Sequence, residues 1–377
     1  MRRDSWVAAA PARLSRRGFA RWSALLGGGA RLPFYNEAAL AQNSDIGPIP
    51  AGAVRINANE NPLGPCPEAL QALHAAARDG CRYFFDAGPR MAALLAEQEG
   101  LRSSYVMPFA GSSDPLHRAV LAFTGKGRPL ITANPGYESP VGAAEFNGAG
   151  SIGVPLTKDW AHDVRAMVKA HPSPGLFYVC NPNNPTGTVT PRADIEWLLA
   201  NKPAGSILLL DEAYIHFCNE PRGTDLVAAG KDVVILRTFS KIYGMAGLRA
   251  GVAMARPDLL GRMRGFGVGF LPSTGMAAAE ASLKVPNLVP ERRKIIADIR
   301  NDVSDWLAAR KISFIPSVSN KIMIDVKRPG REVTSAMAAK GVYIGRSWPA
   351  LPTHVRVTIG TKQEMERFKQ VFAEVVA

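Results

Sequence analysis

The chain has 377 residues, of which 47% are hydrophobic and 20% are charged, and its formal net charge at pH 7 is +13. This is the composition of a globular protein with ample material for a core, and the length favours one large domain with a smaller one. The basic residues are scattered and form no known nucleic-acid-binding motif, so we expect no nucleic-acid partner and interpret the charge as a basic solvated surface, or as a modest bias towards anionic substrates.

The first 41 residues are similar to a bacterial export signal. Arg16 and Arg17 lie in a segment typical of the twin-arginine route, a weakly apolar stretch follows at residues 22–32, and residues 39–41 form a small-x-small cleavage pattern. We therefore predict a twin-arginine-type signal peptide at residues 1–41 and a periplasmic or otherwise exported protein. A basic leader on a cytoplasmic protein is the alternative. The apolar stretch is too short and broken for a stable membrane span.

From about residue 105 onward, short apolar runs alternate with helical patterns. The apolar runs at residues 130–132, 176–180, 207–210 and 233–236 are predicted to be strands. A helix is predicted over residues 191–200, with Thr190 as its N-cap and Pro191 in its first position. This alternation predicts an α/β fold with a mostly parallel sheet and helices on both faces.

After about residue 270 the pattern changes to that of a smaller α+β domain. A long helix is predicted at residues 292–309, strands are predicted at residues 321–326 and 355–359, and Thr361 and Glu364 form a capping box before a C-terminal helix. The predicted domains are an N-terminal arm with part of the small domain at residues 42–80, a large cofactor-binding domain at 81–268 and a C-terminal small domain at 269–377.

Four cysteines are present: Cys66, Cys81, Cys180 and Cys218. None forms a Cys-x-x-Cys pair, so we expect neither a zinc site nor a disulfide framework. Buried free thiols are the prediction, because a free cysteine behaves as a small hydrophobic side chain.

Polar side chains follow each of the four predicted strands. Tyr137 follows the first, Asn184 the second, Asp211 and Tyr214 the third, and Lys241 the fourth. Open α/β sheets bind ligands in the crevice outside the carboxyl ends of their strands. The four strands are therefore predicted to bring an aromatic ring, an amide, a carboxylate with a phenol, and an amine to one crevice.

Lys241 has the surroundings of a lysine that binds an aldehyde cofactor. Thr238 and Ser240 precede it, and Arg249 follows eight residues later. A lysine can form a Schiff base with an aldehyde, whereas hydroxyls and an arginine can bind a phosphate. The combination indicates pyridoxal 5'-phosphate (PLP), with Lys241 also carrying the proton between carbon atoms.

A second phosphate-binding element is predicted upstream of the sheet. Ser112 and Ser113 follow Gly111 and open a helical stretch at residues 115–123. The free backbone N–H groups and the dipole at a helix start favour an anion.

The remaining ring contacts follow from the chemistry of PLP, which works as an electron sink. Asp211 ends a buried apolar strand, where a carboxylate needs a cationic partner, so we expect it to face the pyridine nitrogen; a helix N-cap is the alternative. Asn184 and Tyr214 are expected to donate hydrogen bonds to the ring oxygen. Tyr137 is expected to stack on the ring, although alone it would more often be a core aromatic.

Two arginines in the predicted small domain are candidates for substrate binding. Arg356 lies in the predicted strand at residues 355–359, and Arg346 lies ten residues earlier. A guanidinium is well suited to clamping a carboxylate or a phosphate, although either residue could be a surface charge.

These motifs, taken in order, resemble the fold type I PLP-dependent aminotransferases, and most closely their histidinol-phosphate aminotransferase-like branch. The resemblance covers the chain from about residue 54 to its end. The motifs that carry it are Asn59-Glu60-Asn61-Pro62, Pro135-Gly136-Tyr137, residues 181–187, residues 211–214, Ser240-Lys241, Gly247-Leu248-Arg249 and Arg356.

The resemblance implies a homodimer that moves an amino group from an amino donor to a 2-oxo acid, usually 2-oxoglutarate. It implies that Tyr83 reaches the cofactor phosphate of the neighbouring subunit, and that Arg356 binds the substrate carboxylate or an equivalent group. Arg346 would read the distal part of the substrate, and Asn59 would belong to the substrate site. Two departures from the family pattern are Phe84, where the family commonly has proline after the tyrosine, and Trp348 between the two arginines.

Two other functions stay open on the same scaffold. A PLP-dependent decarboxylase or lyase of the threonine-phosphate decarboxylase type would need the same residues around its cofactor, because the cofactor stabilises either carbanion. A non-enzymatic binding protein would not need Lys241. The amino donor also stays open between histidinol phosphate, aromatic amino acids and others.

Overall fold

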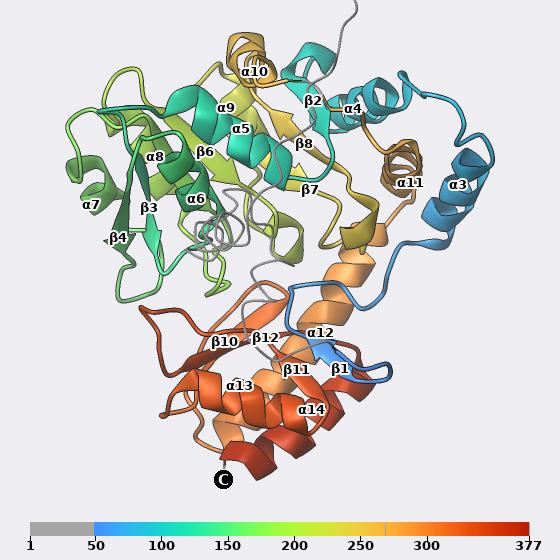
Figure 1. Cartoon of the computed structure of the whole chain (residues 1–377), viewed down its shortest axis with the longest axis vertical. Helices are drawn as coiled ribbons and strands as arrows, with labels where there is room; N and C mark the ends of the chain where they lie inside the picture. The colour runs from blue at the N-terminus through green and yellow to red at the C-terminus, as the bar shows by residue number, and fades with distance from the viewer. Residues whose placement is uncertain (1–48, 268, 377) are drawn as a thin grey trace, which may run out of the picture. The chain divides into compact units, whose positions relative to one another are not determined.

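The computed structural model describes residues 49–267 and 269–376, and the predicted export signal at residues 1–41 lies outside them (Figure 1). The strands of the large sheet are β2 (Val106–Phe109), β3 (Leu130–Asn134), β4 (Ser151–Pro155), β5 (Leu176–Cys180), β6 (Ile207–Asp211), β7 (Val233–Thr238) and β8 (Gly251–Met254). Their order is β2-β8-β7-β6-β5-β3-β4, and within this sheet only β8 runs antiparallel to its neighbours. The predicted mostly parallel α/β sheet is confirmed.

The central strands are buried along their whole length. Every residue of β5, β6 and β7 is buried, as expected for parallel strands that are covered on both faces. The helices around the sheet are α3 (Pro67–Arg78), α4 (Ala87–Gln98), α5 (Ser113–Phe123), α6 (Ser139–Phe146), α7 (Val164–Lys169), α8 (Arg192–Asn201), α9 (Thr224–Ala228), α10 (Pro257–Arg264) and α11 (Ser273–Leu283).

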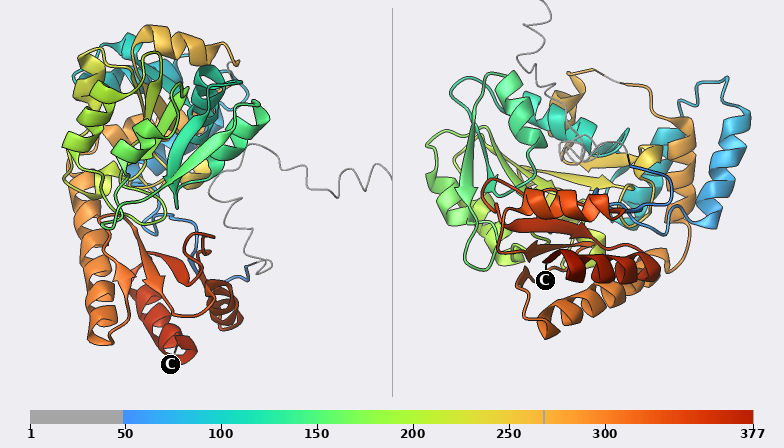
Figure 2. Two further views of the ribbon diagram at one scale, coloured as in Figure 1. Left: turned by 90° about the vertical axis from the view of Figure 1, so that its left-hand side faces the viewer. Right: turned by 60° about the horizontal axis from the view of Figure 1, so that its bottom comes forward.

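The C-terminal part of the chain, together with β1, forms a second group of strands and helices. Its elements are β1 (Val54–Ile56), α12 (Leu288–Ala309), β9 (Phe314–Ile315), β10 (Lys321–Asp325), α13 (Gly330–Ala339), β11 (Val342–Ile344), β12 (His354–Thr358) and α14 (Lys362–Val376). Strand β10 pairs antiparallel with both β12 and β9, whereas β1 pairs in parallel with β11. Helices α13 and α14 lie side by side against these strands (Figure 2). The N-terminal strand therefore completes a structure otherwise built by the C-terminal part.

The start of α14 is the predicted capping box. The Thr361 backbone N–H donates to Glu364 Oε2 at 2.7 Å, and the Glu364 N–H donates to Thr361 Oγ1 at 3.2 Å. The helix buries Met365, Phe368 and Phe372. The reciprocal bonds satisfy two donors that a helix start would leave free.

The N-cap predicted for the helix at residues 191–200 is wrong. Helix α8 begins at Arg192, and extended Pro191 occupies the cap position without a side-chain bond. The Thr190 hydroxyl instead accepts from the His162 backbone N–H at 3.1 Å and lies 2.9 Å from His162 Nδ1. A buried tertiary partner has replaced the local bond that the sequence suggested.

The cysteines are free, but not all are buried as predicted. Cys66 and Cys180 are buried, whereas Cys218 is half-buried and Cys81 is exposed. Cys81 lies in the turn that follows α3, where no core is available to cover it. In the described part of the chain, no helix combines the length and apolar character that a membrane span requires.

Candidate functional site

A cavity of about 230 Å³ lies where β5, β6 and β7 end. The parallel register places Cys180 opposite Asp211, and Asp211 opposite Leu236, so the residues that follow these strands meet at one edge. Of the residues predicted from the sequence, those that line the cavity are Ser112, Tyr137, Asn184, Asp211, Tyr214, Thr238, Ser240, Lys241 and Arg249. The lining also includes Ala58, Glu60, Cys180, Ala213 and Ala246.

Lys241 is held with its amine inside this cavity. The residue is only 8% exposed, and its Nζ donates to the Ala58 carbonyl oxygen at 3.4 Å. The turn before it is fixed by Thr238, whose Oγ1 accepts from the Ser240 N–H at 3.1 Å and donates to Ser240 Oγ at 2.9 Å. The lysine is therefore presented by a rigid turn and does not extend freely into solvent.

Asp211 is a buried carboxylate at the end of β6. It accepts hydrogen bonds from the Tyr178 hydroxyl at 2.8 Å and from the Ala213 N–H at 3.0 Å. Burial raises the pKa of Asp211 from 3.8 to about 6, against the opposing effects of these bonds and of the Lys241 charge. A carboxylate in this state gains most from a cationic partner. Tyr178 was missed from the sequence; its signal is a hydroxyl in an otherwise apolar buried strand, which needs a partner.

An anion-binding cup lies at the start of α5. Ser112 is the N-cap residue, and Gly111 before it has a φ of +86°. A Cβ at Gly111 would collide with the guanidinium of Arg249, which donates to Ser240 Oγ at 3.3 Å and to the Ala110 carbonyl at 3.2 Å. The cup thus combines a helix start, hydroxyls and an arginine, all of which suit a phosphate. Ser113 is the first residue of α5 but does not line the cavity.

Asn59 links the amide side of the cavity to the C-terminal strands. It is fully buried, and its Nδ2 donates to Tyr214 Oη at 3.0 Å and to Asn184 Oδ1 at 3.4 Å. Asn184 Oδ1 also accepts from Arg356 Nη1 at 3.1 Å. Arg356 is fully buried on β12 and does not line the cavity, but its partner Asn184 does. The alternative of a surface charge is wrong for Arg356.

Arg346 is already paired in this structure. Its Nη1 and Nη2 donate to the two carboxylate oxygens of Glu138 at 2.8 and 2.6 Å. The guanidinium also lies over the ring of Trp348, 4.0 Å from its centroid, and that indole donates to the Gly136 carbonyl at 3.0 Å. Glu138 follows Tyr137 directly and was missed, because nothing local in the sequence indicates an arginine 208 residues away as its partner.

Tyr83 lies away from the cavity of its own chain. It is 73% exposed and stacks on Phe270, with ring centroids 5.0 Å apart, and on Phe85, with centroids 5.6 Å apart. Phe85 and Phe270 are each 72% exposed. Three large aromatic rings thus form one exposed cluster, which we call the aromatic patch.

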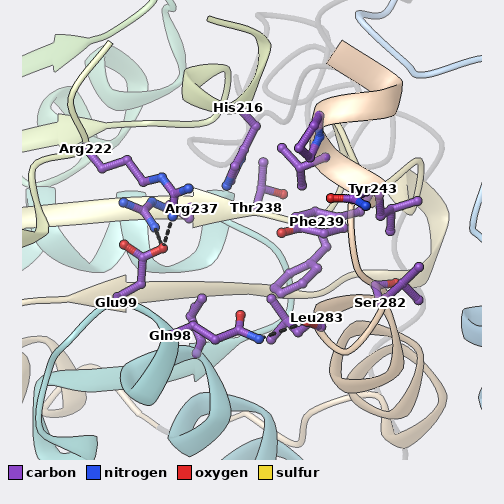
Figure 3. Close-up of a pocket in the computed structure, with 16 residues that line it drawn as sticks. Gln98, Glu99, His216, Arg222, Arg237, Thr238, Phe239, Tyr243, Ser282 and Leu283 are labelled. Carbon is purple, nitrogen blue, oxygen red and sulfur yellow. Dashed lines mark hydrogen bonds and ion pairs between the residues drawn. The ribbon is translucent and has the colours of Figure 1, made fainter. Parts of the chain in front are cut away.

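A second cavity, of about 170 Å³, is lined by Arg237 and Thr238 from the end of β7, together with Glu99 and His216 (Figure 3). Thr238 lines both cavities. Buried Arg237 forms ion pairs with Glu99 at 2.6 Å and with Glu212 at 2.8 Å, and Arg222 forms a further pair with Glu99 at 2.5 Å. The two arginines and the two glutamates therefore neutralise one another through ion pairs.

The residues of the first cavity fit PLP. A buried carboxylate with a raised pKa suits a protonated ring nitrogen, the cup at Gly111 suits a phosphate, and the amine of Lys241 suits an aldehyde. The chemistry of the donor set thus matches the cofactor indicated by the sequence.

Comparisons with known proteins agree with this geometry. The family model "Aminotransferase class I and II" matches residues 52–372. A histidinol-phosphate aminotransferase of Moorella thermoacetica is 34% identical over 342 residues, which cover 86% of each chain. An aromatic amino acid aminotransferase of Rhodococcus jostii is 32% identical over 86% of this chain and 93% of its own. The crystal structure of the Sinorhizobium meliloti histidinol-phosphate aminotransferase in complex with PLP aligns with a TM-score of 0.80 at 26% identity, over 96% of this chain and 99% of that one.

Proposed function

Because the chain belongs to the aminotransferase class I and II family and is a PLP-dependent transaminase, we propose that it moves the amino group of an amino acid or a histidinol-phosphate-like amine to a 2-oxo acid such as 2-oxoglutarate. The observation that carries the proposal is the placement of Lys241 and Asp211 in one buried cavity. When bound, PLP supplies the electron-withdrawing ring.

The proposed roles follow the chemistry of each side chain. Lys241 would hold the cofactor and would carry a proton between carbon atoms, and Asp211 would keep the ring nitrogen protonated. Tyr137 would stack on the ring, whereas Asn184 and Tyr214 would donate to the ring oxygen. The proposed phosphate ligands are Ser112, the backbone of Ser113, Thr238, Ser240 and Arg249.

The substrate is proposed to lie on the amide side of the cavity. Arg356 would bind the substrate carboxylate or an equivalent group, with support from its bond to Asn184, and Asn59 would hold both Asn184 and Tyr214 in place. Arg346 would read the distal end of the substrate after release from Glu138. A bidentate guanidinium is the natural partner for either anionic group.

A homodimer is proposed from the aromatic patch. Exposed rings of this size that cluster together commonly mark a protein interface. A second copy of the chain would cover Tyr83, Phe85 and Phe270, and Tyr83 would then reach the cofactor phosphate of the partner. Sedimentation of the wild type and of Phe270→Ser tests this: we expect a dimer that the substitution weakens, and a monomeric wild type would contradict it.

Export by the twin-arginine route is proposed from the sequence of the first 41 residues. Arg16→Lys with Arg17→Lys should retain the protein in the cytoplasm of an expressing bacterium, while the unchanged protein is found in the periplasmic fraction. Equal distribution of the two proteins would contradict export.

The proposed reaction is tested by following the cofactor spectrum during addition of single amino donors. We expect at least one donor from a panel of aromatic, acidic and aliphatic amino acids and histidinol phosphate to convert the bound PLP to its pyridoxamine form, and a 2-oxo acid to reverse the change. Release of carbon dioxide without any need for an acceptor would instead identify a decarboxylase.

A further inference from the structure

A second lysine lies buried against the ring of Tyr214. Lys321, the first residue of β10, is 0% exposed, and its Nζ lies 3.2 Å from the centroid of that ring. The amine of Lys241 lies 5.7 Å from the same centroid. A cation on an aromatic face is attracted by the ring quadrupole, and the attraction is strongest where water is excluded. Lys321 therefore acts on Tyr214 at closer range than Lys241 does.

The position of Lys321 is fixed by its neighbours. Its Nζ donates to Ser319 Oγ at 3.0 Å, and Ser319 is also fully buried. The adjacent Asn320 donates through Nδ2 to the Asn59 carbonyl at 3.1 Å. Since Asn59 itself donates to Tyr214 Oη, the loop before β10 and the Tyr214 hydroxyl share one hydrogen-bonded support.

Lys321 does not line the cavity, so it cannot bind the cofactor there directly. Its charge nevertheless reaches the cavity wall: burial raises the pKa of the Cys180 thiol, and the charge of Lys321 acts in the opposite direction. Two lysines face the ring of Tyr214, Lys321 from β10 and Lys241 after β7. The other charged or titratable groups that line the same cavity are Arg249 after β7, Asp211 and Cys180 at the ends of β6 and β5, Tyr137 after β3 and Glu60 after β1, and Arg356 on β12 is joined to it through Asn184.

We propose that Lys321 is a positioning residue that makes the Tyr214 hydroxyl a stronger donor, and so lowers the pH at which the nitrogen joining Lys241 to PLP loses its proton. A nearby cation favours the ionised phenol and polarises its O–H bond. A stronger hydrogen bond from Tyr214 to the ring oxygen of PLP would draw negative charge from that oxygen. The oxygen would then stabilise the proton on the nearby nitrogen less, and that nitrogen would lose its proton at a lower pH. The direct repulsion between two cations acts in the same direction. The inference rests on the proposed contact of Tyr214 with the cofactor.

The test is a pH titration of the visible absorbance of the bound cofactor, without any donor. Lys321→Met removes the charge at similar length, and we expect the midpoint to rise by about one pH unit. Lys321→Arg keeps the charge and should stay near the wild type. Lys202→Met, which removes another largely buried lysine away from the cavity, should leave the midpoint unchanged.

A double-mutant cycle shows whether the effect passes through the hydroxyl. In a Tyr214→Phe background, the shift caused by Lys321→Met should fall to less than half. No shift in the single variant, or an equal shift in both backgrounds, overturns the proposal. If Lys321→Met does not fold, Lys321→Gln makes the same comparison, and a large midpoint shift in Lys321→Arg would also overturn it.

This test separates its own failure from that of the proposed function. The titration uses no amino donor, so a missing half-reaction with every donor would count against the amino transfer alone. A wild-type protein whose bound PLP gives no titrating band would overturn this inference, whereas the role of Lys241 would be judged by borohydride reduction and peptide mapping of the lysine that carries the cofactor.

Discussion

The two cavities that Thr238 lines in common each hold a buried carboxylate, and the pKa values of these two carboxylates are shifted in opposite directions. At the second cavity, burial raises the pKa of Glu99, but the attraction of Arg237 and Arg222 outweighs burial and leaves the pKa below its ordinary value. At the first, Asp211 is met by the neutral donors of Tyr178 and Ala213, and its pKa is raised to about 6.

The opposite pKa shifts of Glu99 and Asp211 distinguish a charge that stabilises the fold from a charge suited to binding a cationic ligand. The ion pairs of Glu99 are completed within the protein, so the energy of burying them is offset in the folded chain. Among the described residues Asp211 forms no ion pair with an arginine, and its two hydrogen bonds and the charge of Lys241 offset its burial only in part, so a further cation would stabilise it. A structural charge network and a functional one therefore lie at two cavities that Thr238 lines in common.

The largest effect on function relative to stability is expected from Lys241→Ala. Without the amine, amino transfer should fall by at least about 10³-fold, the range for loss of a positioned acid–base group. Stability should change little, because the bond of the lysine to the Ala58 carbonyl is long, at 3.4 Å, and removing a buried charge also removes the cost of its desolvation. The rate of the half-reaction and urea unfolding measure the two effects. Exposed Lys231→Ala is the control, and a rate within tenfold of the wild type would contradict the role.

The opposite pattern is expected at the second cavity. Arg237→Met would leave Glu99 and Glu212 without their shared buried partner and should destabilise the protein by about 3–5 kcal/mol. Urea unfolding measures this loss, and the half-reaction rate per folded, PLP-loaded molecule should stay within a few-fold of the wild type. Lys327→Met, which breaks the ion pair of exposed Lys327 with Asp325, is the control and should cost less than about 1 kcal/mol. An unchanged stability in Arg237→Met would mean that these charges do not hold the fold.

Asp211→Asn should separate stability from cofactor binding. Folding of the apoprotein makes Asp211 harder to ionise than it is in the unfolded chain, because its pKa rises from the ordinary value of 3.8 to about 6. This group therefore removes about 3 kcal/mol of apoprotein stability as the pH rises from about 4 to about 6, and the loss persists above that pH. The asparagine variant should escape this loss at pH 8, yet bind PLP about 100-fold more weakly. Urea unfolding of the apoprotein and PLP titration measure both, and an apoprotein no more stable than the wild type would contradict the first part.

The smallest effect is expected from Glu138→Gln, which tests whether Arg346 is a paired charge or a latent ligand. Loss of the carboxylate should free the guanidinium and raise kcat/KM for donors with an anionic distal group by about tenfold relative to phenylalanine. Steady-state kinetics with glutamate, histidinol phosphate and phenylalanine measure the ratio. Glu145→Gln, at an exposed site on α6, serves as the control, and an unchanged ratio would indicate that Arg346 is structural.

The sequence predicted the parallel sheet and most of the cavity lining, because both depend on local patterns. A buried parallel strand is a continuous apolar run, and the polar residue behind it marks the sheet edge where ligands bind. The same logic located Asp211 and Lys241 without any knowledge of their distances. The capping box at Thr361 was equally predictable, since both partners lie within one helical turn.

The missed features depend on contacts between distant parts of the chain. Thr190 was assigned to the nearest helix, but its hydroxyl meets His162 in another segment. Glu138 and Lys321 carry no local signal, because their partners Arg346 and Tyr214 are distant in sequence. Periodicity reports which face of an element is buried, and it does not report which side chain lies opposite.

The hydrogen bond from the Asn59 N–H to Thr358 Oγ1 joins residues 299 positions apart. A ribosome makes Thr358 299 residues after Asn59, so this bond can form only after β12 has emerged. The strands of the large sheet, by contrast, are complete well before the last helix is synthesised. The amide side of the cavity therefore forms after the large sheet, and nascent chains that stop before β12 should hold Asn59 without its bond to Thr358.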